Sequence, residues 1–290
     1  LGVRVINMSY GPEAAGMLAD FSSLRMMGAA ANKKMVFVRA AGNHGVKLET
    51  QQFSTNFQAW SKLKNLIIVG AVKSNRKIAS FSNRPGLGCF KAKKDTKCIK
   101  KNKYKYFTVV APGQSIYAGL GNGGYGTMSG TSMAAPHVTG VVALLHGYWP
   151  VLKKRAGSTT NIIFKTAQDL GKKGVDPVYG WGLVRADRAL SPLGKKYLGK
   201  NNKIYSLSAS HLKVSPALSA LTTQSVTFFD GYDRDFQMPL ATLAPSYAGV
   251  LNTWMRDGYE RQEYTLGSNS GLSYAFSANG YDPMNPSLAD

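Results

Sequence analysis

Four short, largely apolar runs divide the first part of the chain, and most of their apolar residues stand at neighbouring positions without strict alternation. They cover residues 3–9, 35–40, 66–69 and 107–110. Continuous apolar runs of this length are typical of strands that are buried on both faces of a parallel sheet. Residues 14–32 carry apolar side chains at helical spacing between the first two runs. The pattern therefore predicts an α/β fold in which helices flank a mainly parallel sheet.

A long helix is predicted from Ser132 up to Pro150, which ends it. Pro136 is expected in the first turn of this helix, where a missing N–H costs little. Two shorter helices are predicted at residues 159–169 and 186–190. The apolar stripe of the long helix follows the i, i+3, i+4, i+7 spacing and consists of Val138, Val141, Val142, Leu145 and Trp149.

Composition and charge both change in the last third of the chain. After about residue 194, short Ser, Thr and Leu stretches alternate with Gly, Asn and Pro turn signals, which favours β-structure. Residues 222–290 hold three Lys or Arg against eight Asp or Glu, a net charge of −5. Because the whole chain carries +21, the residues before them carry +26. We therefore predict a domain over residues 1–193, a linker over 194–221 and a β-rich extension over 222–290.

Much of the positive charge lies in residues 91–105, which contain eight lysines and one aspartate. Cys89 and Cys98 are the two cysteines of the chain. They could close a short hairpin through a disulfide, which needs an oxidising compartment, or stay as two free thiols. The lysine run is either a solvated surface loop or a patch for nucleic acid or anionic glycans. It lacks the aromatic array of a nucleic-acid site, so no nucleic-acid partner is expected.

Residues 126–138 form the segment with the clearest chemistry. A glycine-rich stretch leads into the predicted helix and would present Ser132 at the helix N-terminus. Unpaired backbone N–H groups and the helix dipole favour a developing negative charge there. A nucleophilic serine needs such surroundings when it forms a tetrahedral oxyanion. From the residues alone, Ser132 could instead be a structural helix cap.

This segment closely resembles the nucleophile motif of the subtilisin-like serine proteases. Further segments match that family in its chain order, at residues 5–11, 40–43, 79–83 and 110–113. The resemblance covers about residues 3–190. It implies the subtilisin-like α/β fold, with the N-terminal strands of that fold missing from the sequence.

The resemblance also assigns roles to individual residues. It makes Ser132 the nucleophile and Asn43 the side-chain donor of the oxyanion hole, although Asn43 alone would be assigned to a turn. Residues 5–11 and 40–43 would form the two walls of the primary specificity pocket, and the first would pair with the substrate backbone. Tyr10 would line a substrate pocket, whereas by itself it is equally a half-buried aromatic residue at a strand end. The predicted substrate-binding residues are Ser9, Tyr10, Gly11, Ala41 and Gly42.

The sequence contains no evident catalytic base for Ser132. The chain order in this family is Asp, His, Ser, so both partners are expected before Leu1. Residues 1–290 alone are therefore expected to show at most residual hydrolysis, since removal of the histidine alone costs subtilisin about 10⁶ in kcat. None of the four histidines stands in a His-Gly-Thr-His-like setting, and all are expected to be structural or solvated: His44, His137, His146 and His211.

Residues 226–236 resemble the stretch that follows the protease domain in autotransporter subtilases, which are Gram-negative proteins exported through a C-terminal outer-membrane β-barrel. The resemblance implies a secreted or cell-surface protein with such a barrel beyond residue 290, whereas a generic β-rich C-terminal domain is the alternative. No apolar run is long enough to span a bilayer. No cofactor is expected for the chemistry. The family often binds structural calcium, but Asp230, Asp233 and Asp235 lack EF-hand spacing and are expected in a solvated turn.

These features predict a serine endopeptidase that cleaves protein or peptide substrates through an acyl-enzyme, present here without its catalytic Asp and His. The alternative is a non-catalytic remnant of the same scaffold that binds anionic surfaces through its lysine-rich loop. An Asp-Gly motif followed by a His-Gly-Thr-His-like motif upstream of Leu1 would favour the protease.

Overall fold

The computed structural model describes residues 2–10, 15–17, 35–53, 65–92, 97–99, 102–121, 123–198, 210–211, 224–239 and 275–276. The chain divides into two compact units, Leu1–Ser191 (unit 1) and Pro192–Asp290 (unit 2). The predicted linker and extension both belong to unit 2, and their boundaries stay predictions. The predicted helix over residues 14–32 lies outside the described residues, apart from residues 15–17.

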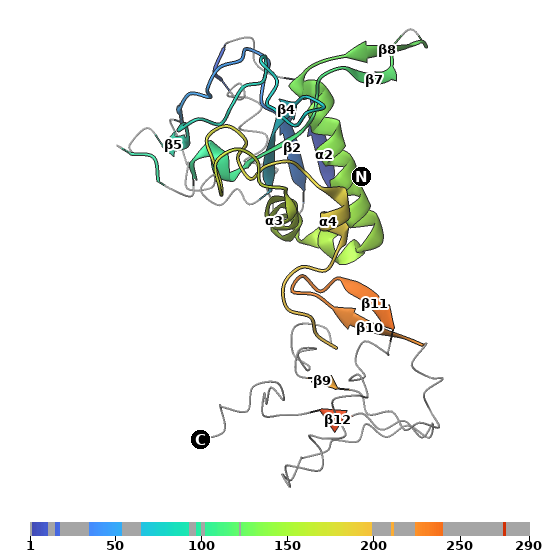
Figure 1. Ribbon diagram of the computed structural model, residues 1–290. Coiled ribbons are helices and arrows are strands. Elements are labelled where there is room, and N and C mark those ends of the chain that lie inside the picture. Colours follow the sequence, from blue (N-terminus) through green and yellow to red (C-terminus); the bar gives the residue numbers. More distant parts are fainter. Residues whose placement is uncertain are drawn as a thin grey trace. The chain divides into compact units, whose positions relative to one another are not determined.

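A four-stranded parallel sheet forms the centre of unit 1 (Figure 1). Strands β2 and β4 are buried along their whole length, as continuous apolar runs in a sheet covered on both faces require. The four strands predicted from the sequence are confirmed, and so is the α/β class. The sheet order is β1-β2-β4-β6, with β1 at Val5–Met8, β2 at Val36–Ala40, β4 at Leu66–Val72 and β6 at Thr108–Pro112.

Helix α2 (Thr131–Tyr148) packs against all four strands of this sheet. Its apolar stripe is buried at Val138, Val142 and Leu145, which confirms the predicted core-facing side. Pro136 is the sixth residue of α2, so its predicted place in the first turn is wrong. A proline there has no N–H to donate to the carbonyl four residues earlier.

Three shorter helical segments follow α2. Pro150 opens the 3-10 helix η4 (Pro150–Lys154), and α4 (Ala186–Leu190) lies where it was predicted. Helix α3 (Ala156–Thr166) begins and ends three residues before the predicted range. It ends early because Gln168 already pairs with Leu183 in an extended conformation.

Smaller strand pairs flank the central sheet. Strands β3 (Gln51–Phe53) and β5 (Phe90–Ala92) pair in parallel, and β7 (Ile116–Gly119) and β8 (Tyr125–Met128) form an antiparallel hairpin that projects from unit 1 (Figure 1). The 3-10 helix η3 (Tyr104–Tyr106) packs its first tyrosine against Phe90. Cys89 and Cys98 are joined by a disulfide, with Cα atoms 6.0 Å apart, which decides between the two alternatives left by the sequence.

The regular secondary structure described in unit 2 consists of β-strands. Strands β10 (Ser225–Phe229) and β11 (Asp235–Pro239) form an antiparallel hairpin, and β9 (Ser210–His211) pairs with β12 (Ala275–Phe276). The turn of the hairpin is not solvated as predicted, because Asp230 and Asp233 are both buried. Arg234 donates to Asp230 Oδ2 at 2.7 Å, and both side chains are fully buried. A buried carboxylate needs such a partner.

The described part of the chain contains no helix that is long and apolar enough to cross a membrane.

His146 is buried near the C-terminal end of α2, with Nε2 3.0 Å from Thr159 Oγ1. Its Nδ1 has no hydrogen-bond partner among the described residues. Burial lowers the pKa of His146, and the positive charges of Lys153 and Arg4 lower it further. The folded protein therefore keeps His146 neutral at pH values where the unfolded chain already binds a proton.

We expect the free energy of unfolding to fall as the pH drops below about 6.5, the ordinary histidine pKa, because only the unfolded state then gains this proton. The loss reaches at most about 1.4 kcal/mol per pH unit and stops at the lowered pKa of the folded state. His146→Gln keeps a hydrogen-bonding group without titrating and should flatten this dependence in urea unfolding. The exposed control His137→Gln should leave it unchanged. An equal slope in wild type and His146→Gln would contradict this explanation.

Candidate active site

Ser132 is the second residue of α2 and is half-buried at the N-terminus of that helix. Strand β8 leads into it through an extended Gly130, whose N–H donates to the Gly113 carbonyl at 2.7 Å. A Cβ on Gly113 would lie 2.8 Å from the Gly130 carbonyl oxygen and 2.6 Å from Ala71 Cβ, so only glycine allows this close approach. The turn thus fixes where the helix starts and where Ser132 stands.

The Asn43 side chain is held against the first residue of α2. Its Oδ1 accepts hydrogen bonds from the backbone N–H and the hydroxyl of Thr131, each at 2.8 Å. The same hydroxyl accepts the Gly42 N–H at 3.0 Å. With Oδ1 taken up by Thr131, the Asn43 Nδ2 donors face Gly130, 3.3 Å from where a Cβ on that glycine would stand. The structure therefore aims an amide donor at the entry to the helix.

A second asparagine, Asn83, holds the loop that follows β2. Its Nδ2 donates to the Ala41 carbonyl at 3.0 Å, and its Oδ1 accepts the N–H groups of His44 and Val46 at 3.0 and 3.2 Å. Asn83 is buried, and its own N–H donates to the Gly42 carbonyl. Gly42 has a φ of +101°, and a Cβ there would lie 2.5 Å from Asn83 Nδ2. From the sequence, Asn83 belongs only to the matching segment at residues 79–83 and has no predicted role of its own.

Four of the five predicted substrate-binding residues lie just beyond the carboxyl ends of two neighbouring parallel strands, β1 and β2. Ser9 and Tyr10 follow β1, while Ala41 is buried just after β2 and precedes Gly42. The guanidinium carbon of Arg39 lies over the Tyr10 ring, 4.5 Å from the ring centroid. This cation–π contact was not predicted from the sequence. Gly11 lies outside the described residues. Their roles in substrate binding stay predictions.

The part of the chain that the structure describes gives Ser132 no histidine partner. His44 and His137 are exposed, and His137 Nδ1 bonds within its own helix. His146 lies near the other end of α2, and His211 belongs to unit 2. Within the same described ranges, no group of three or more His, Cys, Asp or Glu could hold a metal ion. The site therefore combines a serine and an amide donor, without a histidine base among the described residues.

Comparison with known proteins matches residues 1–182 to the subtilase family. Subtilisin DY of Bacillus licheniformis is 33% identical over 188 residues, which cover 65% of this chain and 57% of that protein. Serotype-specific antigen 1 of Mannheimia haemolytica is 32% identical over 174 residues, which cover 56% of this chain and 16% of that protein. An extracellular serine protease of Serratia marcescens is 29% identical over 208 residues, which cover 64% and 18%.

The chain thus spans 57% or less of the length of these three relatives. Among solved structures, the prenylagaramide maturation protease PagA is 25% identical. It superposes with a TM-score of 0.47 over 64% of this chain and 61% of that chain.

Asn83→Ala should destabilise unit 1, because it leaves two N–H donors and one carbonyl of the 41–46 loop without their partner. We expect the free energy of unfolding to fall by about 1–3 kcal/mol in urea titrations. The matched control is Asn75→Ala, at an exposed asparagine whose Oδ1 accepts the Lys77 N–H at 3.1 Å. That change should cost less than about 0.5 kcal/mol. Equal losses in the two variants would show that Asn83 does not hold the loop.

Proposed function

This chain belongs to the subtilase family, and we propose that it forms the part of a serine endopeptidase that carries the nucleophile and the oxyanion hole. One observation carries the proposal. Ser132 stands at the N-terminus of α2 beside the Asn43 amide, whose oxygen is occupied by Thr131 and whose nitrogen is left to donate. Helix caps need no such amide donor, so this arrangement favours the nucleophile over the structural cap.

In the proposed reaction, Ser132 Oγ attacks the carbonyl carbon of a peptide bond and its proton passes to a histidine. The carbonyl oxygen becomes an oxyanion, which accepts hydrogen bonds from Asn43 Nδ2 and the Ser132 backbone N–H. The histidine then gives its proton to the leaving amine, and an acyl-enzyme remains on Ser132. Water, activated by the same histidine, hydrolyses this ester and restores the serine.

The position of Thr131 explains why the Asn43 amide is useful to this chemistry. If the amide were flipped, its nitrogen would face the Thr131 backbone N–H, which is also a donor, and its oxygen would face the developing negative charge. The two hydrogen bonds at 2.8 Å oppose that flip. A donor that is already oriented costs no reorganisation when the charge develops.

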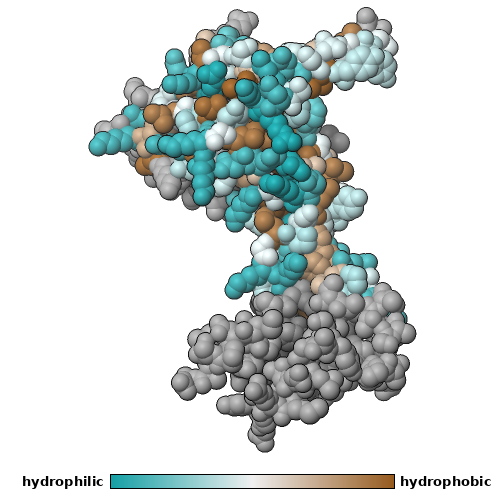
Figure 2. Space-filling model, in the orientation of Figure 1, coloured by the Kyte–Doolittle hydropathy of each residue, from teal (hydrophilic) through white to brown (hydrophobic). Residues whose placement is uncertain are grey.

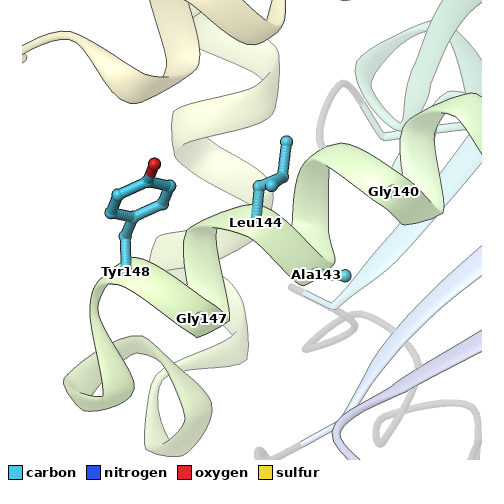
Figure 3. Close-up of a pocket in the computed structure, with 5 residues that line it drawn as sticks. All are labelled: Gly140, Ala143, Leu144, Gly147 and Tyr148. Atoms are coloured by element: carbon cyan, nitrogen blue, oxygen red, sulfur yellow. The ribbon is translucent and has the colours of Figure 1, made fainter.

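We infer that the histidine and aspartate come from a segment outside residues 1–290, and one surface of α2 supports this. The helix has an outward face of small and apolar residues that lines a shallow pocket (Figure 3). Leu144 is 46% exposed and Tyr148 is 68% exposed there. Contiguous apolar exposure of this kind marks surfaces that pack against another element. The pocket residues are Gly140, Ala143, Leu144, Gly147 and Tyr148.

The proposed substrates are proteins or peptides, bound between the ends of β1 and β2. A peptide strand could pair with the backbone of Ser9 and Tyr10, as extended ligands do at sheet edges. We also propose that the protein is secreted. The Cys89–Cys98 disulfide favours an oxidising compartment, and a relative from Serratia marcescens is described as extracellular.

A fluorophosphonate probe should label Ser132 rapidly only when the base is present. In a protein that joins residues 1–290 to the preceding part of the domain, we expect covalent labelling and peptidase activity, both abolished by Ser132→Ala. Ser129→Ala is the control, because Ser129 Oγ accepts the Ser115 N–H at 2.9 Å and has no role in the proposed reaction. Residues 1–290 alone should react far more slowly, since loss of the histidine costs about 10⁶ in kcat. Labelling that survives Ser132→Ala would refute the assignment.

Removal of the amide donor should slow catalysis with little change in KM. Asn43→Ala should lower kcat about 10²–10³-fold, the size of effect known for the matching asparagine of subtilisin. Thr131→Val should cost about tenfold, because it removes one of the two hydrogen bonds that orient the amide. The control is Thr139→Val in the same helix. The Thr139 hydroxyl donates to Asn7 Oδ1, and its removal should leave kcat unchanged. The measurement is steady-state kinetics. Equal kcat values for Thr131→Val and Thr139→Val would contradict the proposal that Thr131 orients the Asn43 amide.

A further inference from the structure

Two large apolar side chains are exposed beside the disulfide of unit 1. Leu87 is 71% exposed and Ile99 is 48% exposed. The Cys89–Cys98 disulfide joins the two segments on which they lie, and the Ile99 carbonyl accepts the Asn102 N–H at 3.0 Å. Single exposed apolar residues are common on protein surfaces. Leu87 and Ile99 differ from such single residues, because they lie on two segments that one disulfide holds together. Together they form a local apolar feature for which we expect a binding partner.

Lysines accompany both segments. Lys97 is exposed immediately before Cys98, and Lys103 pairs through its backbone with Cys89. The disulfide therefore links the segment of Lys97 and Ile99 to that of Leu87, and the backbone pairing with Cys89 adds Lys103. Cations next to exposed aliphatic side chains make a surface that is both positively charged and apolar.

A second lysine-bearing loop lies alongside. Lys105 Nζ donates to the Val175 carbonyl at 2.9 Å, which ties the η3 segment to the 171–176 loop. That loop carries Lys172 and Lys173, both exposed. Figure 2 shows many hydrophilic residues on the face of unit 1 that is turned toward the viewer. The positive charge thus extends beyond the run that the sequence indicated.

Three of the four described carboxylates of unit 1 are engaged by other groups, and the fourth, the exposed Glu49, lies against Gly16. Asp176 is buried and accepts backbone N–H groups, and Asp169 accepts the Gly174 N–H. Asp187 pairs with Arg185 at 2.6 Å. The ammonium groups of Lys97 and Lys103 form no ion pair within the described ranges. They remain available for an external anion.

We propose that Leu87, Lys97, Ile99 and Lys103, which we call the disulfide-loop surface, bind the headgroup region of an anionic lipid bilayer. The ammonium groups would pair with lipid phosphates, while the two aliphatic side chains enter the boundary between headgroups and acyl chains. This assigns the exposed leucine and isoleucine a role that a purely electrostatic ligand would not need. The proposal is independent of the peptidase function, because it involves no residue of the candidate active site.

A nucleic acid fits this surface less well. Single-stranded nucleic acid is held by aromatic side chains on which bases stack. Of the two tyrosines of η3, Tyr104 is buried, and the Tyr106 ring lies under the Lys105 ammonium group, 5.2 Å from its centroid. Neither presents an open stacking face beside Lys97 or Lys103.

Vesicle co-sedimentation tests the proposal with residues 1–290, after mass spectrometry has verified the disulfide. We expect binding to phosphatidylcholine vesicles that contain phosphatidylglycerol, weakening as salt is raised, and little binding to phosphatidylcholine alone. Lys97→Gln with Lys103→Gln should weaken binding about 25-fold, at about fivefold per lysine. Leu87→Ser with Ile99→Ser should weaken it at least about tenfold.

The matched control is Lys153→Gln with Lys154→Gln, which removes the same charge from η4. This segment follows the C-terminal end of α2, away from β5 in Figure 1. The control should bind within about twofold of wild type. If the two double-lysine variants lost vesicle affinity equally, the effect would come from net charge alone, and the proposal would be overturned. So would a lack of vesicle binding, equal binding to neutral vesicles, or full binding by the Leu87/Ile99 variant.

Discussion

One side-chain contact, between the Asn43 amide and Thr131, connects the sheet to the N-terminus of α2. Asn43 follows β2 and Thr131 begins α2, so the contact joins residues 88 positions apart in the sequence. Both hydrogen bonds end on the same amide oxygen, at 2.8 Å. The amide nitrogen is consequently the group left to face a reacting carbonyl oxygen. The proposed oxyanion hole depends on this relative position of strand and helix.

The remaining structure of unit 1 maintains that position. The fully buried β2 and β4 fix the end of the sheet from which the Asn43 loop emerges. Asn83 then fastens the loop through three hydrogen bonds to its backbone, and Gly113 allows the turn before α2 to pass close to β4. These contacts hold the proposed nucleophile and amide donor in place relative to each other, as the proposed chemistry requires.

The sequence predicted the elements with local signals and missed the contacts without them. Continuous apolar runs identified the four central strands, and a one-sided apolar stripe identified α2. Asn83 gave no signal because its partners lie about forty residues away, beyond any local pattern. Arg39 is a charged residue inside an apolar strand, and only the fold shows that Tyr10 covers it. Asp230 was expected in solvent because acidic turns usually are, but Arg234 compensates its burial.

A crystal structure of the protein with its base present and Ser132 phosphonylated would test the central claim most directly. The account predicts that the phosphoryl oxygen lies about 2.7–3.1 Å from both Asn43 Nδ2 and the Ser132 backbone nitrogen. Thr131 should still hold Asn43 Oδ1 in that adduct. A phosphoryl oxygen directed away from Asn43, or an amide rotated off Thr131, would contradict the account.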